Sequence, residues 1–233
     1  MSAIPKPMQE REPTPELHSG DHMTREEFHR IYEQMPEHFK AELIGGVVYV
    51  ASPLKLRHGT NHPALSAVMF TYRGHTPGVQ LGDNTTVLLG SDSEPQPDLF
   101  LRILPEYGGQ SQTTEDDYVL GAPELVAEIA HSSRSIDLYK KREKYRQFGV
   151  REYLVLSLDE KRLRWFDLTE DKELLAGDGI VRAKNFPGLW TDAAALFADD
   201  YGRLMSAVNQ GIASPEHAQF VERLANKKAS NAT

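Results

Sequence analysis

Apolar positions recur along the chain with two different periods, one typical of helices and one typical of strands. After Thr24, the side chains of Phe28, Ile31 and Tyr32 recur at helical spacing. Glu27, three positions after Thr24, completes a pattern typical of a helix start. Elsewhere, short runs rich in β-branched and apolar residues predict strands. The pattern as a whole predicts an α/β fold.

The expected elements follow one another at close intervals, with turn residues between them. Strands are expected at 42–50 (with a turn at Gly45-Gly46), 79–81, 85–89, 97–104, 124–130, 153–158 and 163–168. Further helices are expected near 62–73, at 136–148 up to Gly149, and at 189–196, 201–210 and 215–227. Polar loops are expected at 53–58 and 107–117.

The stretch from 124 to 158 reads strand, helix, strand. A helix that connects two neighbouring strands makes them parallel, with a right-handed crossover. The next strand, at 163–168, can fold back as a hairpin across residues 159–161. These connections predict a mixed β-sheet flanked by helices, within one domain that has no internal repeats.

Two carboxylates lie within or beside apolar strands. Asp98 opens the run Leu99 to Leu101, and Glu128 lies inside the run 125–130. A buried carboxylate is costly unless a cation or a hydrogen-bond donor meets it. Two of them on neighbouring strands therefore suggest a shared cation, although caps or buried ion pairs would also explain them.

A lysine occupies the apolar stripe of the helix that follows. On a helical wheel for 136–148, Lys141 lies between Leu138, Tyr145 and Phe148, where an ordinary surface lysine would not. Its stem could extend to the helix edge and leave the ammonium in water. Alternatively, the ammonium points toward Glu128 and a bound phosphate.

Composition narrows the setting of this chemistry. The chain has 233 residues and no cysteine, which excludes disulfides, thiolate zinc sites and a cysteine nucleophile. No apolar stretch approaches the length of about 18 residues that a membrane span needs, and the Pro- and Glu-rich start is unlike a signal peptide. We therefore expect a cytoplasmic protein without a membrane partner.

Charge is unevenly distributed along the chain. The net charge of −8 argues mildly against tight nonspecific binding to nucleic acid. Between Arg134 and Arg151, however, seven basic residues stand against two acidic ones. Such a run is usually a solvated helix face, but its position directly after Glu128 also fits a phosphate-binding role.

Two acids and a lysine on a sheet and helix suit phosphodiester hydrolysis. Carboxylates can hold Mg²⁺, which takes few protein ligands, and the ion stabilises charge that develops on phosphate oxygens. A nearby ammonium can orient the attacking water or offset the same charge. No Ser-His-Asp order, nucleotide-binding glycine loop or zinc-type histidine spacing competes with this interpretation.

At these residues the chain resembles the Uma-two family, a group of bacterial restriction-endonuclease-like proteins within the PD-(D/E)XK nuclease superfamily. The resemblance runs from about Met23 to Phe220. The elements that carry it are Glu42-Leu43-Ile44-x-Gly46, Pro53 with His58, Pro97-Asp98-Leu99, Pro123 to Ile129, Asp137-x-x-x-Lys141-x-x-x-Tyr145, Gly149-Val150-x-Glu152-Tyr153 and Phe186-Pro187-Gly188-Leu189. In the superfamily a lysine follows the strand glutamate by two positions, whereas this chain has Ala130 there.

The resemblance implies a restriction-endonuclease-like mixed sheet and an endonuclease that cuts nucleic acid, with DNA as the expected partner and Mg²⁺ or Mn²⁺ as cofactor. A disordered tail (1–22), a nuclease-like domain (23–200) and a C-terminal helical extension and tail (201–233) are expected. Asp98 and Glu128 would be metal ligands, and Glu42 a third acid. Lys141 would replace the missing lysine and act at the phosphate, while His58 would be an auxiliary group. A homodimer is expected if both strands of a duplex are cut.

Each assignment has a structural alternative. Glu42 could be an ordinary acid at a helix end, and His58 a loop or capping histidine. Tyr145 is expected to be a core residue. The whole chain could also be a catalytically weak nuclease fold used for binding or regulation. A purely structural α/β protein would bind no metal at all.

Overall fold

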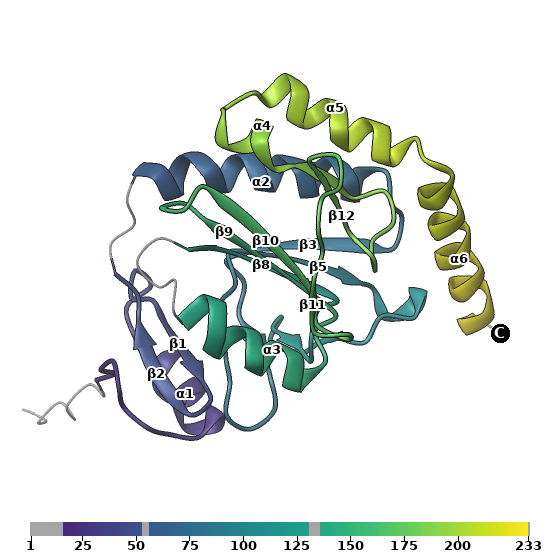
Figure 1. The fold of residues 1–233 in the computed structure, drawn as a ribbon. Helices are drawn as coiled ribbons and strands as arrows, with labels where there is room; N and C mark the ends of the chain where they lie inside the picture. The colour runs from purple at the N-terminus through teal and green to yellow at the C-terminus, as the bar shows by residue number, and fades with distance from the viewer. Residues whose placement is uncertain (1–15, 53–55, 131–135, 233) are drawn as a thin grey trace, which may run out of the picture.

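The structure, a computed structural model, describes residues 16–52, 56–130 and 136–232 (Figure 1). Residues 1–15 of the expected tail and Pro53 of the expected loop lie outside this part of the chain. The central element is a six-stranded sheet. Its strands, in spatial order, are β11 (Lys172–Glu173), β10 (Arg162–Asp167), β9 (Glu152–Ser157), β8 (Leu125–Ala130), β5 (Leu99–Ile103) and β3 (Val79–Asp83).

The pairing within this sheet is mixed, as the sequence predicts. β8 and β9 are parallel, with Glu128 opposite Val155, and the helical segment 136–148 connects them. β10 folds back antiparallel onto β9, and β5 pairs antiparallel with both β8 and β3. The βαβ unit and the hairpin that follows it are therefore both confirmed.

Helices cover the two faces of the sheet (Figure 1). α2 (Leu56–Gly74) packs on one face, where its apolar side chains meet Leu125, Ala127 and Ile129. The π-helical segment η2 (Ile136–Lys141) and α3 (Arg142–Phe148) pack on the other face, against Val126 and Ala130. Since side chains alternate along a strand, Glu128 points to the face that η2 and α3 cover.

A small lobe lies beside the sheet and has its own apolar cluster. It consists of α1 (Arg25–Tyr32), capped by Thr24 as predicted, and the hairpin β1 (Ala41–Ile44) and β2 (Val47–Val50), which turns at Gly45-Gly46. Leu17 is buried in this cluster, and the backbone N–H of Gly20 donates to Val48. Residues 17–22, which we expected to belong to a disordered tail, are therefore packed against the hairpin.

Smaller elements complete the fold. A three-stranded sheet contains β4 (Val87–Leu88), β7 (Val119–Leu120) and β6 (Gln112–Thr113), and a two-stranded sheet contains β12 (Ile180–Arg182) and β13 (Trp190–Asp192). The remaining helices are η1 (Pro105–Tyr107), α4 (Ala193–Phe197), α5 (Tyr201–Ile212) and α6 (Pro215–Asn231). α5 packs outside α2, and α6 runs down one edge of the molecule (Figure 1). Within the described residues, no helix is both long and apolar enough to cross a membrane.

Three local predictions were wrong. α2 begins at Leu56, so His58 lies on a helix and not in a loop. The sequence did not predict this early start because Gly59 and Pro63 are poor helix formers. Residues 136–141 form a π-helix, whose wider turn a short apolar pattern does not distinguish from an α-helix. Residues 190–192 pair as β13, where we expected a helix.

Candidate active site

Asp98 and Glu128 lie next to each other across two paired strands. Asp98 directly precedes β5, and Leu99 pairs with Ala127 of β8. The antiparallel register therefore places Asp98 across from Glu128. The backbone N–H of Ile129 donates to Asp98 Oδ2 at 2.7 Å, which fixes the carboxylate against this strand.

Burial and hydrogen bonding act in opposite directions on Asp98. Burial raises the pKa of a carboxyl group, but the His58 ring, the Ile129 N–H and the charge of Lys141 lower it. The donors outweigh burial, so the pKa of Asp98 lies below its ordinary value. Asp98 is therefore held as a carboxylate at neutral pH, the form that can bind a cation.

Glu128 is almost fully buried and meets two side-chain donors from the helix above it. Lys141 Nζ lies 3.0 Å from Glu128 Oε1, and the Tyr145 hydroxyl donates to the same oxygen at 3.0 Å. The Glu128 side chain keeps only 5% of its surface exposed. A carboxylate in such a place needs donors of this kind, since burying it alone would be very costly.

Glu42 reaches the same lysine from the small lobe. It lies on β1, and its two oxygens are 2.9 Å and 2.8 Å from Lys141 Nζ. The backbone N–H of Gln96, which lies just before Asp98, donates to Glu42 Oε1 at 2.7 Å. Glu42 is therefore a strand residue that faces the central sheet, as the strand predicted from residue 42 implies, and the alternative of an ordinary acid at a helix end is wrong.

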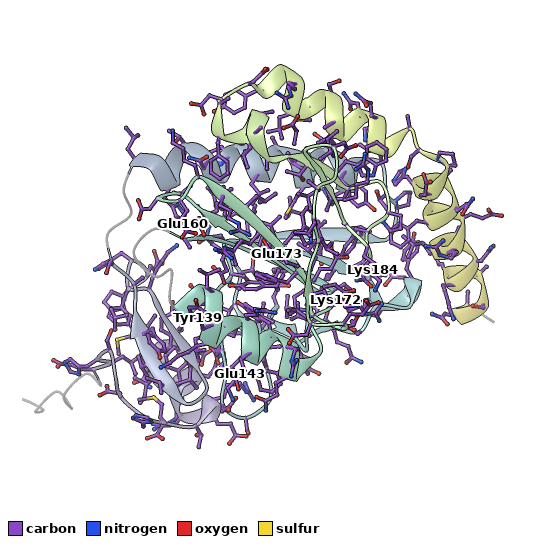
Figure 2. All side chains as sticks on the ribbon, viewed as in Figure 1. Tyr139, Glu143, Glu160, Lys172, Glu173 and Lys184 are labelled. Atoms are coloured by element: carbon purple, nitrogen blue, oxygen red, sulfur yellow. The ribbon has the colours of Figure 1, made fainter. Side chains whose placement is uncertain are left out.

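Lys141 links the lobe to the sheet. Its ammonium is buried between Glu42 and Glu128, so its side chain lies on the inner side of the helix, together with Leu138 and Tyr145. Tyr139, labelled in Figure 2, is 69% exposed on the outer side. The stem of Lys141 does not extend to the helix edge, and its charge is matched by two carboxylates.

The neighbouring basic residues have other partners. Arg142 and Arg146 both pair with Asp171 in the turn between β10 and β11, and Lys144 pairs with Asp92. Lys140 donates to the hydroxyl of Tyr49 on β2 at 2.8 Å. These four residues therefore fasten η2 and α3 to the surrounding elements, and Lys141 differs from them in being buried.

His58 approaches Asp98 from the first turn of α2. Its Nε2 lies 3.2 Å from Asp98 Oδ1. One turn further along, His62 Nε2 lies 3.2 Å from the backbone carbonyl of Asp98, and the two imidazole rings are stacked. The N-terminal end of α2 therefore presents two histidines to the strand that carries Asp98.

The arrangement offers hard oxygen ligands beside an ammonium group. In the described part of the chain, no set of three or more His, Asp or Glu side chains is spaced to hold a metal ion as it stands, and Lys141 lies between two of the three acids. The donor chemistry fits Mg²⁺ or Mn²⁺, which prefer carboxylate oxygens. A cavity of about 910 Å³ lies elsewhere, between the loop after β12 and helices α5 and α6.

Three residues at this site were not predicted as functional. Tyr145 was assigned to the core because its ring fits the apolar stripe of the helix. The sequence pattern gives no indication that its hydroxyl donates to Glu128. Gln96 acts through its backbone, for which a sequence gives no signal. His62 follows His58 by four positions, a helical spacing that would have paired them if the helix had been expected to begin earlier.

Comparisons with known proteins agree with this fold. The model of the Uma2 family, described as "Putative restriction endonuclease", matches residues 25–195. Among solved structures, a protein of Anabaena variabilis described as "a putative nuclease belonging to DUF820" matches with a TM-score of 0.58 and 14% sequence identity. The match covers 72% of this chain and 96% of that one, and at this identity it shows a common fold. No curated protein matches the chain.

Proposed function

The chain belongs to the Uma2 family of restriction-endonuclease-like proteins, and we propose that it is a metal-dependent endonuclease that hydrolyses phosphodiester bonds of DNA. The observation that carries this proposal is the position of Lys141. Its ammonium lies within 3.0 Å of both Glu42 and Glu128. Glu128 directly precedes Ile129, whose backbone N–H binds Asp98. Three acids and one lysine from four separate elements converge there, although Ala130 stands in the usual lysine position.

Each residue has a role that follows from its chemistry. Glu42, Asp98 and Glu128 would hold Mg²⁺ or Mn²⁺, which supplies Lewis-acid stabilisation of the charge on the phosphate oxygens. Lys141 donates to the scissile phosphate or to the attacking water, and thereby offsets negative charge in the transition state. His58 is an auxiliary group that holds the Asp98 carboxylate in place.

The wider setting follows from the same proposal. The protein acts in the cytoplasm on DNA, and cleavage of both strands of a duplex would require two such sites, which a homodimer supplies. With a net charge of −8, affinity for the DNA backbone outside the site is expected to be low.

A plasmid-nicking assay tests the proposal. Wild-type protein with Mg²⁺ or Mn²⁺ should convert supercoiled DNA to the open-circular form, and EDTA should stop the reaction. Asp98→Ala should abolish nicking, whereas Asp178→Ala, which removes a surface acid paired with Arg182, should not. Nicking by Asp98→Ala at the wild-type rate in Mg²⁺ would contradict the assignment of Asp98, and nicking by wild type in EDTA would contradict metal dependence.

Metal binding can be measured without cleavage. Clustered carboxylates repel one another unless a cation is present, so Mg²⁺ or Mn²⁺ should raise the melting temperature by mass action. Asp98→Asn should remove most of this shift. Equal metal-induced shifts in wild type and Asp98→Asn would count against Asp98 as a ligand.

A second candidate function is a catalytically weak nuclease fold used for binding or regulation. Ala130 and the acidic net charge favour it. It predicts a metal-induced thermal shift and DNA binding without nicking. Running the two assays on the same protein separates the two functions.

A further inference from the structure

Two side-chain donors meet at a single oxygen of Glu128. Lys141 Nζ and the Tyr145 hydroxyl each lie 3.0 Å from Glu128 Oε1, and Tyr145 follows Lys141 by one turn of helix. We infer that Tyr145 is a positioning residue, which holds the Glu128 carboxylate in the orientation needed for metal binding and catalysis. This inference rests on the proposed function and concerns the same site.

The two donors differ in how firmly they are fixed. The lysine ammonium stands on a stem with four rotatable bonds and is shared between Glu42 and Glu128. The tyrosine ring is buried and packs against the ring of Tyr153, with the ring centroids 5.1 Å apart. Because this ring is held on α3, its hydroxyl is a donor of fixed position. Glu128 therefore keeps the hydrogen bond from Tyr145 when Lys141 turns toward a phosphate.

A purely structural explanation of Tyr145 accounts for less of the geometry. A phenylalanine would fill the same apolar space beside Leu138 and Tyr153. The hydroxyl adds a hydrogen bond to a buried carboxylate that already has a donor in Lys141. Groups that orient metal-binding carboxylates typically change metal affinity or activity by about 10- to 100-fold when they are removed. The effect should therefore appear in metal binding and turnover more than in folding.

The chain provides a matched control on the other face of the sheet. Tyr72 of α2 is also buried, and its hydroxyl donates to the backbone carbonyl of Pro187 at 3.0 Å. Tyr72→Phe removes one buried hydrogen bond of a tyrosine hydroxyl, as Tyr145→Phe does, but far from Glu128. If the loss of a buried tyrosine hydrogen bond alone changed metal binding or nicking, the change should be the same in both variants.

The experiment compares wild type, Tyr145→Phe and Tyr72→Phe as full-length proteins in two titrations with Mn²⁺. In the first, the metal-induced rise in melting temperature gives an apparent affinity without any cleavage. In the second, single-turnover nicking gives a rate and its dependence on Mn²⁺ and DNA. Tyr145→Phe should need about 10- to 100-fold more Mn²⁺ or turn over slower by that factor, with the half-saturating DNA concentration unchanged. Tyr72→Phe should match wild type in both titrations.

The possible failures are distinguishable. If wild type responds to Mn²⁺ and cuts, and Tyr145→Phe behaves like Tyr72→Phe, then Tyr145 is only a core residue and the inference is overturned. If wild type shows neither a metal-induced shift nor nicking, the proposed function itself fails. A third result is that wild type binds Mn²⁺ but does not cut, and that the Mn²⁺-induced thermal shift of Tyr145→Phe is weaker than that of wild type. The positioning role then stands for metal binding, and the nuclease proposal falls.

Discussion

One buried glutamate lies just before strand β8 and another lies within it, and the partners of the two side chains differ in kind. Glu124, immediately before the strand, accepts backbone N–H bonds from Ile103 at 2.8 Å and Gln110 at 3.1 Å. Glu128, within the strand, accepts bonds from the side chains of Lys141 and Tyr145. Both residues are nearly inaccessible to solvent, so burial does not distinguish them.

The type of donor distinguishes them. Backbone N–H groups are fixed parts of the fold, and Glu124 uses two of them to fasten the end of β5 to the loop around Gln110. A side-chain donor such as Lys141 can move, and its hydrogen-bond partner can change from one carboxylate to another or to a phosphate. We therefore propose that Glu124 serves folding and Glu128 the chemistry of the site, although the two stand four positions apart in one short stretch of sequence.

The largest expected effect comes from neutralising each glutamate in turn. Glu128→Gln should abolish nicking, because the amide removes the negative charge that a divalent cation needs. The fold should be retained, since the amide oxygen can still accept a bond from Tyr145 or Lys141. Plasmid nicking and melting temperature, measured on the same preparation, check both parts.

Glu124→Gln should show the opposite result. Its new NH₂ group faces the N–H of Ile103 or Gln110 in a buried place, and an unsatisfied buried donor costs about 1–3 kcal/mol. The melting temperature should therefore fall, while nicking at a temperature where the variant is folded stays near that of wild type. Loss of nicking in a folded Glu124→Gln would end the distinction between the two residues.

The next largest effect concerns the two successive lysines. Lys141→Ala should reduce nicking by about 100- to 1,000-fold, as expected for the loss of a group that stabilises transition-state charge. The Mn²⁺-induced thermal shift should persist, because the ammonium is not a ligand. Lys140→Ala, which removes a contact with Tyr49, should cost far less and should act through general attraction to phosphate. Equal losses of nicking in both variants would mean that Lys141 contributes only general positive charge, as Lys140 does.

The sequence predicted those site residues whose side chains break a pattern. Glu128 and Lys141 are charged groups in apolar stripes, and the structure places both where the pattern implies, on facing surfaces of β8 and the helix. The βαβ unit was predictable for the same reason, since it depends on local periods and a glycine stop. Their roles in cleavage remain predictions.

The rest depends on partners far apart in the chain. The run of lysines and arginines could not be recognised as ion-paired, because Asp92 and Asp171 come from other elements. The hydrogen bond of the Tyr145 hydroxyl could not be predicted either, because its ring fits the apolar pattern of the helix. The placement of the Glu42 lobe is set by tertiary contacts such as the hydrogen bond from Gln96, and no local period encodes these.

The smallest effect is a pH dependence of stability at Glu124. Burial raises the pKa of Glu124 above the ordinary 4.5, and the N–H groups of Ile103 and Gln110 offset this only in part. Above pH 4.5 the unfolded chain therefore loses this proton before the folded protein does. Because the folded state binds more protons in this range, the contribution of Glu124 to stability falls as the pH rises from 4.5 through the raised pKa, and is constant on either side.

Urea unfolding in EDTA, over a series of pH values, measures this contribution as the difference in unfolding free energy between wild type and Glu124→Gln. That difference should decrease with rising pH across the stated range, since glutamine does not titrate. An increase would mean that the two N–H groups outweigh burial and hold Glu124 as a carboxylate, as the donors at Asp98 do. In that case the pKa of Glu124 would be lowered like that of Asp98, and the type of donor would still separate Glu124 from Glu128.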